Sequence, residues 1–191
     1  MQLRLISLVV VLAAATTATA APAKKKYHFE LTAVTAKAEV KPEVAKSATP
    51  RVEAQVHKAF ANHPQLVADL DGAPDPKTSA DPYRKYLVKK GLSGSYLVTV
   101  EITEASEELV PMEGKGSQRF NVRVAIHMLG ENIPDRTIAF TGDGQATIKQ
   151  EVGKIVRDKD RDYTWDSAAE LAVHDAIETS LARLGLPQKK K

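Results

Sequence analysis

Two glycine-containing segments carry residue types that catalytic motifs need, but each departs from the motif it resembles. Residues 91–95 (GLSGS) place a serine among glycines, as a nucleophile elbow does, but the second glycine of the G-x-S-x-G pattern is missing. A nucleophile elbow also follows a strand, whereas this segment precedes a predicted one, so we expect a turn here. Residues 142–144 (GDG) lack the third glycine of a dinucleotide fingerprint and the lysine of a phosphate loop. We interpret them as a place where two elements pack closely.

A run of alternating charges before the last predicted helix imitates a calcium-binding loop. Residues 158–162 (DKDRD), followed by Asp166, place acids at positions 1, 3, 5 and 9 of such a loop. Tyr163 stands where the sharp turn needs glycine, and Ala169 stands where the bidentate glutamate belongs. Two interleaved cations also offset the negative charge. We therefore expect a polar loop that leads into a helix capped by Asp166, and no functional calcium.

The histidines do not form a metal motif. There is no H-x-x-x-H pair among the five of them, and His174, between Glu170 and Glu178, fits a solvated helix face. We assign no catalytic, cofactor-binding or metal-binding residue from the sequence. An enzyme site assembled from residues distant in sequence stays open, for instance from His127, Asp143 and Glu101.

Two classes of function follow from this survey. The favoured hypothesis is an exported, non-catalytic envelope binding or assembly factor that acts through a protein partner, with no cofactor. The alternative is a secreted, hydrolase-like enzyme. A cluster of titratable groups in a pocket would favour the enzyme, and an apolar surface patch would favour the binding protein.

The N-terminal segment has the three parts of a secretory signal peptide. A short cationic start ending at Arg4 precedes an apolar run over residues 5–15 and a small-residue tail. The apolar run is shorter than the roughly 20 residues that a membrane-spanning helix needs. Residues 18–20 (ATA) satisfy the cleavage rule, so we expect residues 1–20 to be removed and the mature chain to start at Ala21. The expected location is periplasmic or extracellular.

Charge and cysteine content limit the possible partners of the mature chain. Without Arg4 and the lysine clusters at residues 24–26 and 189–191, 20 basic residues remain against 24 acidic ones. The body is thus mildly acidic, and its few aromatic residues argue against nucleic-acid binding. The lysine tails at residues 21–26 and 188–191 could touch anionic surfaces weakly. With no cysteine in an exported chain, stability must come from packing, which residues 27–187 are numerous enough to provide as a single domain.

Alternating apolar residues predict most of a β-sheet. The alternation predicts strands from Tyr27, from Tyr96 to Thr103, from Phe120 to Met128 and from Ile138 to Ala146, with the second and third antiparallel. A short strand is expected over residues 66–70, an acidic loop over 104–116 and a turn over 130–135.

Helical spacing predicts three helices. One should start at a Thr49-Pro50 cap and end near residues 62–64, and a short one should start at residues 81–82 and close at Gly91. The last should run from Asp166 to Gly185, with Leu186 folding back onto it, and should dock on the glycines at 142 and 144. The order β-α-β-α-β-β-β-α indicates an α/β two-layer sandwich, with a mixed, mostly antiparallel sheet and helices on one face.

The second half of the chain resembles the CsgG, LpoB and TolB N-terminal group of envelope proteins. The likeness rests on the strand 96–100 (YLVTV), the strand 120–128, the segment 140–146 (FTGDGQA) and the alanine-rich helix from Ala168. Members of that group act as assembly or activation factors by binding other envelope proteins. Many are lipid-anchored through a cysteine, which this chain lacks, and no functional residue carries over.

Overall fold

The computed structural model describes residues 24–113 and 116–186. Along the chain the elements are β1 (Lys26–Ala36), α1 (Pro42–Asn62), β2 (Leu66–Val67), α2 (Ala80–Lys89), β3 (Leu92–Pro111), β4 (Gln118–Asn132), β5 (Ile138–Val152) and α3 (Asp158–Gly185). The predicted signal peptide, residues 21–23 of the predicted N-terminal tail and the whole predicted C-terminal tail lie outside the described residues.

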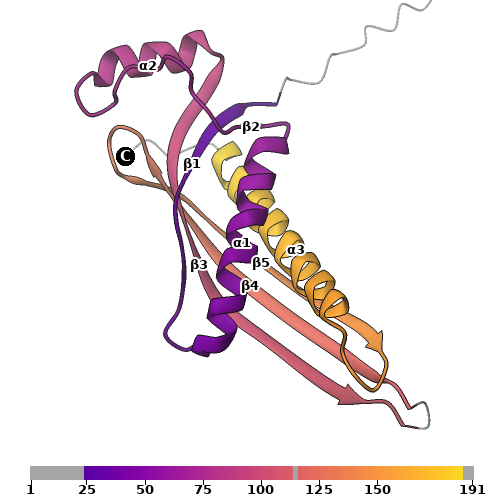
Figure 1. Cartoon of the computed structure of the whole chain (residues 1–191). Helices are drawn as coiled ribbons and strands as arrows, with labels where there is room; N and C mark the ends of the chain where they lie inside the picture. The colour runs from indigo at the N-terminus through magenta and orange to yellow at the C-terminus, as the bar shows by residue number, and fades with distance from the viewer. Residues whose placement is uncertain (1–23, 114–115, 187–191) are drawn as a thin grey trace, which may run out of the picture.

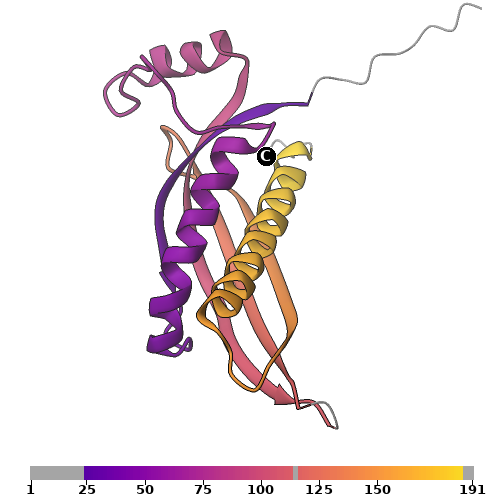
Figure 2. The same ribbon diagram turned by 45° about the vertical axis from the view of Figure 1, so that its right-hand side comes forward.

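The strands form one mixed sheet with the order β2-β1-β3-β4-β5. The pairs β1/β2 and β1/β3 are parallel, and β3/β4 and β4/β5 are antiparallel. Helices α1 and α3 lie side by side over one face of the sheet, and α2 stands apart at one end (Figures 1 and 2). We call the face under α1 and α3 the core face, the opposite face the outer face, and the end near α2 the upper end. The predicted fold class and element order are confirmed.

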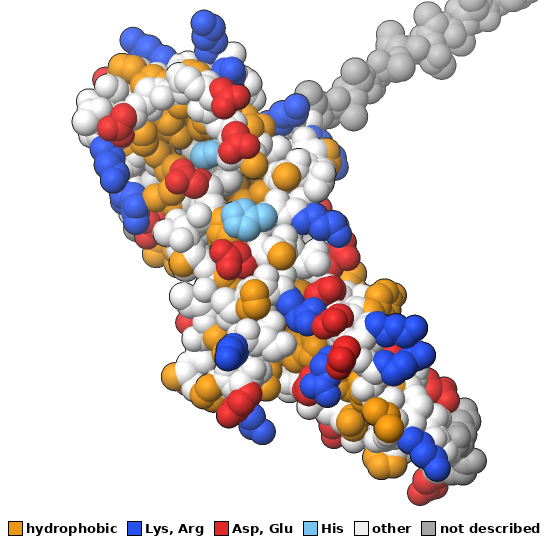
Figure 3. Space-filling model, in the orientation of Figure 1, with side chains coloured by type: hydrophobic (Ala, Val, Ile, Leu, Met, Phe, Trp, Pro, Cys, Tyr) orange, Lys and Arg blue, Asp and Glu red, His pale blue; other side chains and the backbone are white. Residues whose placement is uncertain are grey.

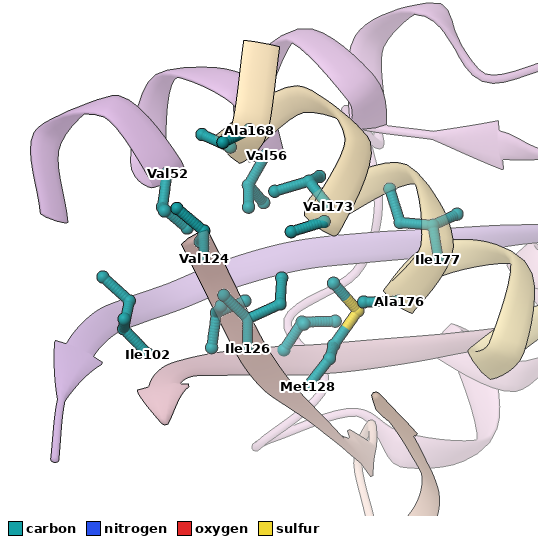
Figure 4. Packing of buried hydrophobic residues seen from close by; sticks show 14 of the residues in the cluster. Val52, Val56, Ile102, Val124, Ile126, Met128, Ala168, Val173, Ala176 and Ile177 are labelled. Atoms are coloured by element: carbon teal, nitrogen blue, oxygen red, sulfur yellow. The ribbon is translucent and has the colours of Figure 1, made fainter. Parts of the chain in front are cut away.

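The main core lies between the sheet and the two long helices. Val124, Ile126 and Met128 of β4 point toward α3, where Val173 and Ile177 meet them (Figure 4). All five side chains are at most 2% exposed. The alternate residues of the strand thus pack against the apolar stripe of the helix, whose residues recur every three or four positions.

Two glycines of β5 let α3 approach the sheet at backbone distance. A Cβ atom at Gly142 would collide with Ser180 and the carbonyl of Ala176, and one at Gly144 with the carbonyl of Ala172. The prediction that the last helix docks on these glycines is therefore confirmed, and the GDG segment is a packing device.

Helix α1 begins earlier than predicted. Pro42 occupies its first turn, and Pro50, taken as the helix start, lies inside the helix. An internal proline removes one backbone hydrogen bond and typically costs about 3 kcal/mol. Pro50 lies on the exposed side, where water can solvate the freed carbonyl, while Ala48 and Val52 on the other side are at most 1% exposed.

The predicted acidic loop at residues 104–116 is wrong over most of its length, because β3 continues to Pro111. A register shift between Ile102 and Glu104 changes which residues of β3 face the core. As a result, Glu107 lies on the core face, paired in register with Val122 of β4. Its carboxylate accepts hydrogen bonds from Trp165 Nε1 at 2.9 Å and from Arg161 at 2.8 Å. A carboxylate paired in this way can sit at a core-face position that its residue type disfavours.

Helix α3 is longer at its start than predicted and ends differently. It begins at Asp158, so Asp166 lies within the helix and caps nothing. It ends at Gly185 as expected, but Gly185 lacks a positive φ and Leu186 is 64% exposed. The predicted return of Leu186 onto the helix is therefore wrong.

Two smaller boundaries also differ. The strand expected at residues 66–70 covers only Leu66–Val67, and β4 runs through Gly130 to Asn132. The turn that follows contains a cis Ile133-Pro134 bond and Arg136 at φ 55°. None of the helices within the described ranges is both long and apolar enough to cross a bilayer.

Candidate functional site

The outer face of the sheet carries a groove at its upper end, which we call the upper groove. It consists of two adjoining hollows of about 410 and 490 Å³ that share Glu30, Pro76 and Ile133. These volumes fall within the range of small-ligand pockets. Hydrophobic side chains gather beneath α2 in this region (Figure 3). The residues that line the groove are His28, Glu30, Leu31, Thr32, Ala68, Asp69, Leu70, Ala73, Pro74, Asp75, Pro76, Lys77, Tyr83, Leu97, Ile133, Pro134 and Arg136.

A second, small hydrophobic cluster holds the walls of the groove in place. Tyr83 and Leu87 of α2 pack on Leu92 at the start of β3, with Leu70 and Ile133 against them. Leu92 thus packs back on α2 after Gly91, whose φ of 71° is a glycine conformation and which follows the end of the helix as predicted. The walls are therefore fixed by packing and preformed.

Polar contacts join the separate wall segments. Arg84 of α2 donates to Asp135 of the β4/β5 turn at 2.6 Å, and Tyr86 donates to the carbonyl of Asp71 at 2.7 Å. In the loop, the carboxylate of Asp75 accepts from the backbone N–H of Lys77 at 2.9 Å. Helix α2, the loop between β2 and α2, and the β4/β5 turn are thus connected to one another around the groove.

A histidine and a tyrosine of the groove lining are joined by a buried serine beneath them. His28 Nε2 lies 3.2 Å from the carbonyl of Ala68, which assigns the ring proton to Nε2. His28 Nδ1 then accepts from Ser95 Oγ at 2.6 Å, and Ser95 Oγ accepts from the Tyr83 hydroxyl at 2.8 Å. Burial lowers the pKa of His28 and raises the pKa of Tyr83, so all three groups are neutral near pH 7.

This buried trio fastens α2 to the sheet and is not a nucleophile site. Ser95 is only 2% exposed, and its oxygen is already engaged by Tyr83. Residues 92–95, expected as a turn, form the start of β3. The sequence did not indicate the trio, because the alternation of His28 with Tyr27 and Phe29 places it only on the opposite face of the strand from these two residues. It faces away from the main core as expected, but α2 covers it.

The groove has an acidic and a basic end. Glu30, Asp69 and Asp75 line the smaller hollow, and Lys77 and Arg136 line the larger one beside Glu30. A ligand that crosses both hollows meets carboxylates first and cations later. This polarity can orient a charged ligand.

The residues named for a possible enzyme lie in one row on the open part of the outer face. Glu101 of β3 pairs in register with His127 of β4, and His127 with Asp143 of β5. His127 Nδ1 donates to Asp143 Oδ1 at 2.6 Å, and Arg183 reaches within 3.5 Å of the same carboxylate. The structure therefore brings a histidine–aspartate pair together, as a catalytic base requires. No hydroxyl group in the described ranges forms a hydrogen bond to His127 Nε2.

The segment that imitates a calcium loop is helical. Three of its four carboxylates are paired with arginines, since Asp162 and Asp166 accept from Arg51 of α1 at 2.5 and 2.7 Å, and Asp160 accepts from Arg157 at 2.6 Å. The polar loop predicted here is wrong. Within residues 24–113 and 116–186, no cluster of three or more His, Asp or Glu side chains is arranged to hold a metal ion.

The row formed by Glu170, His174 and Glu178 is exposed, as predicted, but it contacts α1. Lys58 donates to Glu170 at 2.9 Å, and His63 lies 3.1 Å from Glu178. Together with the Arg51 pairs, these contacts form a charged seam between the two helices. The cavity beside the seam is about 290 Å³ and is smaller than either hollow of the upper groove.

Comparison with solved structures aligns the chain with several bacterial proteins, some of which are lipoproteins. No family model and no curated protein matches the sequence. A Xanthomonas campestris protein of the DUF330 family aligns with a TM-score of 0.48 and 10% identity, over 85% of this chain and 90% of that one. A minor lipoprotein of Acinetobacter baumannii aligns with a TM-score of 0.42 and 8% identity, over 81% of this chain and 92% of that one. PelC of Paraburkholderia phytofirmans, whose structure is a dodecamer, aligns with a TM-score of 0.31 and 9% identity, over 82% of this chain and 93% of that one. All three TM-scores lie below 0.5, so these alignments support no inference about the family or the function of this chain, and the resemblance to the CsgG, LpoB and TolB N-terminal group stays a prediction.

Proposed function

We propose that this chain is an exported, non-catalytic binding domain of the cell envelope that engages a protein partner through the upper groove. The observation that carries the proposal is the preformed groove itself, with its mixed apolar and polar lining and its opposed charges. Preformed walls favour binding because less conformational freedom is lost when a ligand docks.

The signal-like N-terminus supports export of the chain. The ATA site at residues 18–20 puts the start of the exported form at Ala21. N-terminal sequencing of exported material tests this step. A start at Ala21 supports it, and exported protein that retains Met1 contradicts it.

A protein partner fits the groove better than a small molecule does, because the two adjoining hollows extend along β1 toward the edge of the sheet. Its larger hollow lies against Glu30, Leu31 and Thr32 of β1, the strand next to the edge of the sheet. A polypeptide can therefore enter along the sheet and leave past α2.

Site-specific photocrosslinking in the envelope of the native host tests the proposal. A photoreactive amino acid replaces exposed Lys77 at the groove rim, and the matched control replaces exposed Glu53 on α1. We expect one discrete protein adduct from position 77 and none from position 53. The absence of an adduct at 77, or the same adduct from both positions, contradicts the proposal.

The histidine–aspartate pair supports a second candidate function, a hydrolase-like enzyme. The supporting observation is the 2.6 Å contact between His127 and Asp143 on an open face. The test compares hydrolysis of ester, glycoside and phosphate substrates by the parent and by His127→Ala. If the parent hydrolyses a substrate and the substitution abolishes this activity, the enzyme hypothesis is supported. If the substitution leaves the activity unchanged, the hypothesis that His127 is a catalytic base is rejected.

A further inference from the structure

The two edges of the sheet are treated differently by the fold. At β5, side chains of α3 cover the edge, since Arg183 donates to the carbonyl of Thr141 at 2.7 Å and Asp175 accepts from the N–H of Gln145 at 3.2 Å. At the other side, β2 pairs only with Tyr27 and His28 of β1. Within the described part of the chain, no strand pairs with the outer edge of β1 from Thr32 to Ala36, which runs along the margin of the molecule (Figure 1).

The free edge presents defined hydrogen-bonding groups. The N–H of Lys37 donates to the carbonyl of Ile102 on β3 at 3.0 Å. Because successive residues of a strand point their backbone groups to opposite sides, the N–H groups of Val34 and Ala36 face away from β3. The register shift between Leu31 and Ala33 lies before these residues and leaves their alternation intact. An exposed strand edge of this kind is a template for another strand.

From these observations we propose that an extended segment of the partner adds to the free edge of β1 as a sixth strand and continues into the upper groove. This inference rests on the function proposed above and specifies the chemistry of the partner. Strand addition supplies main-chain hydrogen bonds, and the groove supplies side-chain selection.

The surroundings of the edge specify the side chains of the partner segment. On the core face, Val34 and Ala36 are partly buried and pack against the main core, which favours apolar side chains at alternate positions. On the outer face, Glu30 is exposed and Glu101 lies in register with Thr35. Along the edge, before the segment reaches Lys77 and Arg136 in the groove, the intervening positions are therefore lysine or arginine, by charge complementarity.

Amide exchange measured by NMR on the full mature chain tests strand addition. The probe is the peptide acetyl-Thr-Val-Lys-Val-Lys-Val-Thr-amide, and its counterpart carries glutamate in place of both lysines. In the free protein, the amides of Val34 and Ala36 exchange rapidly, while that of Thr35, which faces β3, is protected. The lysine peptide slows exchange at Val34 and Ala36 by about tenfold or more, and the glutamate peptide does so less.

Several outcomes overturn the inference. Unchanged exchange with the lysine peptide, or equal protection by both peptides, contradicts it. Protection of Val34 in the free protein that grows with protein concentration assigns the edge to a second copy of this chain.

A proline variant separates this inference from the proposed function. Val34→Pro removes an edge donor without removing a bond to β3, and Ala36→Pro is the second choice if the first variant unfolds. The yield of the adduct from position 77 falls about tenfold or more in a folded proline variant, whereas Glu53→Lys leaves it unchanged. An adduct that persists in the proline variant overturns strand addition but keeps the groove as a partner site. If position 77 gives no adduct at all in the parent, the proposed function fails, and the peptide experiment alone decides strand addition.

Discussion

Ile177 provides the most quantitative test of how α3 packs on the sheet. It lies in the middle of the apolar stripe of α3 and is 1% exposed (Figure 4). Ile177→Val removes one methylene group and should destabilise the protein by about 0.5–1.5 kcal/mol. Ile177→Ala leaves a larger cavity and should cost about 2–5 kcal/mol. Ile177→Asp combines this loss of packing with an unpaired buried carboxylate. The combined loss is comparable to the roughly 5–15 kcal/mol total stability of a typical domain, so this variant should unfold.

The control must lie on the same helix and must be exposed. Glu178, which the sequence suggests as a neutral position, contacts His63 and therefore does more than face solvent. Leu171 is 53% exposed and offers a matched aliphatic side chain. Leu171→Ala should stay within about 0.5 kcal/mol of the parent.

Chemical denaturation of the whole series, followed by circular dichroism, measures these differences. The expected order of stability is parent and Leu171→Ala, then Ile177→Val, then Ile177→Ala, with Ile177→Asp unfolded. A loss below about 1 kcal/mol for Ile177→Ala, or an equal loss for Leu171→Ala, would refute the packing of α3 described above.

Three further predictions concern other parts of the fold. Gly144→Ala should destabilise by about 1–3 kcal/mol because the added methyl group meets the backbone of α3, whereas Gly153→Ala, where a Cβ meets nothing within 4 Å, should change the melting temperature little. Glu107→Ala should cost about 1–3 kcal/mol, since it leaves the Trp165 N–H without its acceptor, and it should shift the Trp165 emission maximum. The lowered pKa of His28 means that its neutral form stabilises the fold above the unfolded pKa near 6.5 and that this stability is lost as pH falls toward the folded value. Denaturation below pH 6.5 should therefore depend less steeply on pH in His28→Gln, and an unchanged pH dependence would contradict the argument.

The elements that were predicted correctly from the sequence are those whose apolar residues pack against a single neighbouring element. The alternation in β4 and the alanine-rich stripe of α3 each reflect one packing partner, so pattern and structure agree. The GDG segment was understood correctly for the same reason, because small residues at alternate positions indicate a close approach.

The errors arose where a distant contact outweighs a local preference. Pro50 is a strong signal for the start of a helix, yet α1 continues through it because residues before and after it in the sequence are packed in the core. Glu107 made residues 104–111 look like a loop, because its partners Trp165 and Arg161 come more than 50 residues later. Asp166 looked like a cap for the same reason, since its partner Arg51 lies on another helix.

The upper groove could not be foreseen from the sequence. Its lining comes from β1, the loop after β2, α2, β3 and the β4/β5 turn, and no short motif links them. The row formed by Glu101, His127 and Asp143 was proposed as one possible combination, and the strand registers do place the three side by side.

The central claim, that the upper groove binds the partner, is tested most directly by an amide chemical-shift map. The labelled mature chain is titrated with the protein captured by crosslinking at Lys77, or with the lysine peptide if no protein is captured. We expect the largest shifts at Glu30–Thr32, in the loop at residues 69–77 and in the turn at residues 133–136. Shifts confined to the seam between α1 and α3, or to the row around His127, would contradict the claim.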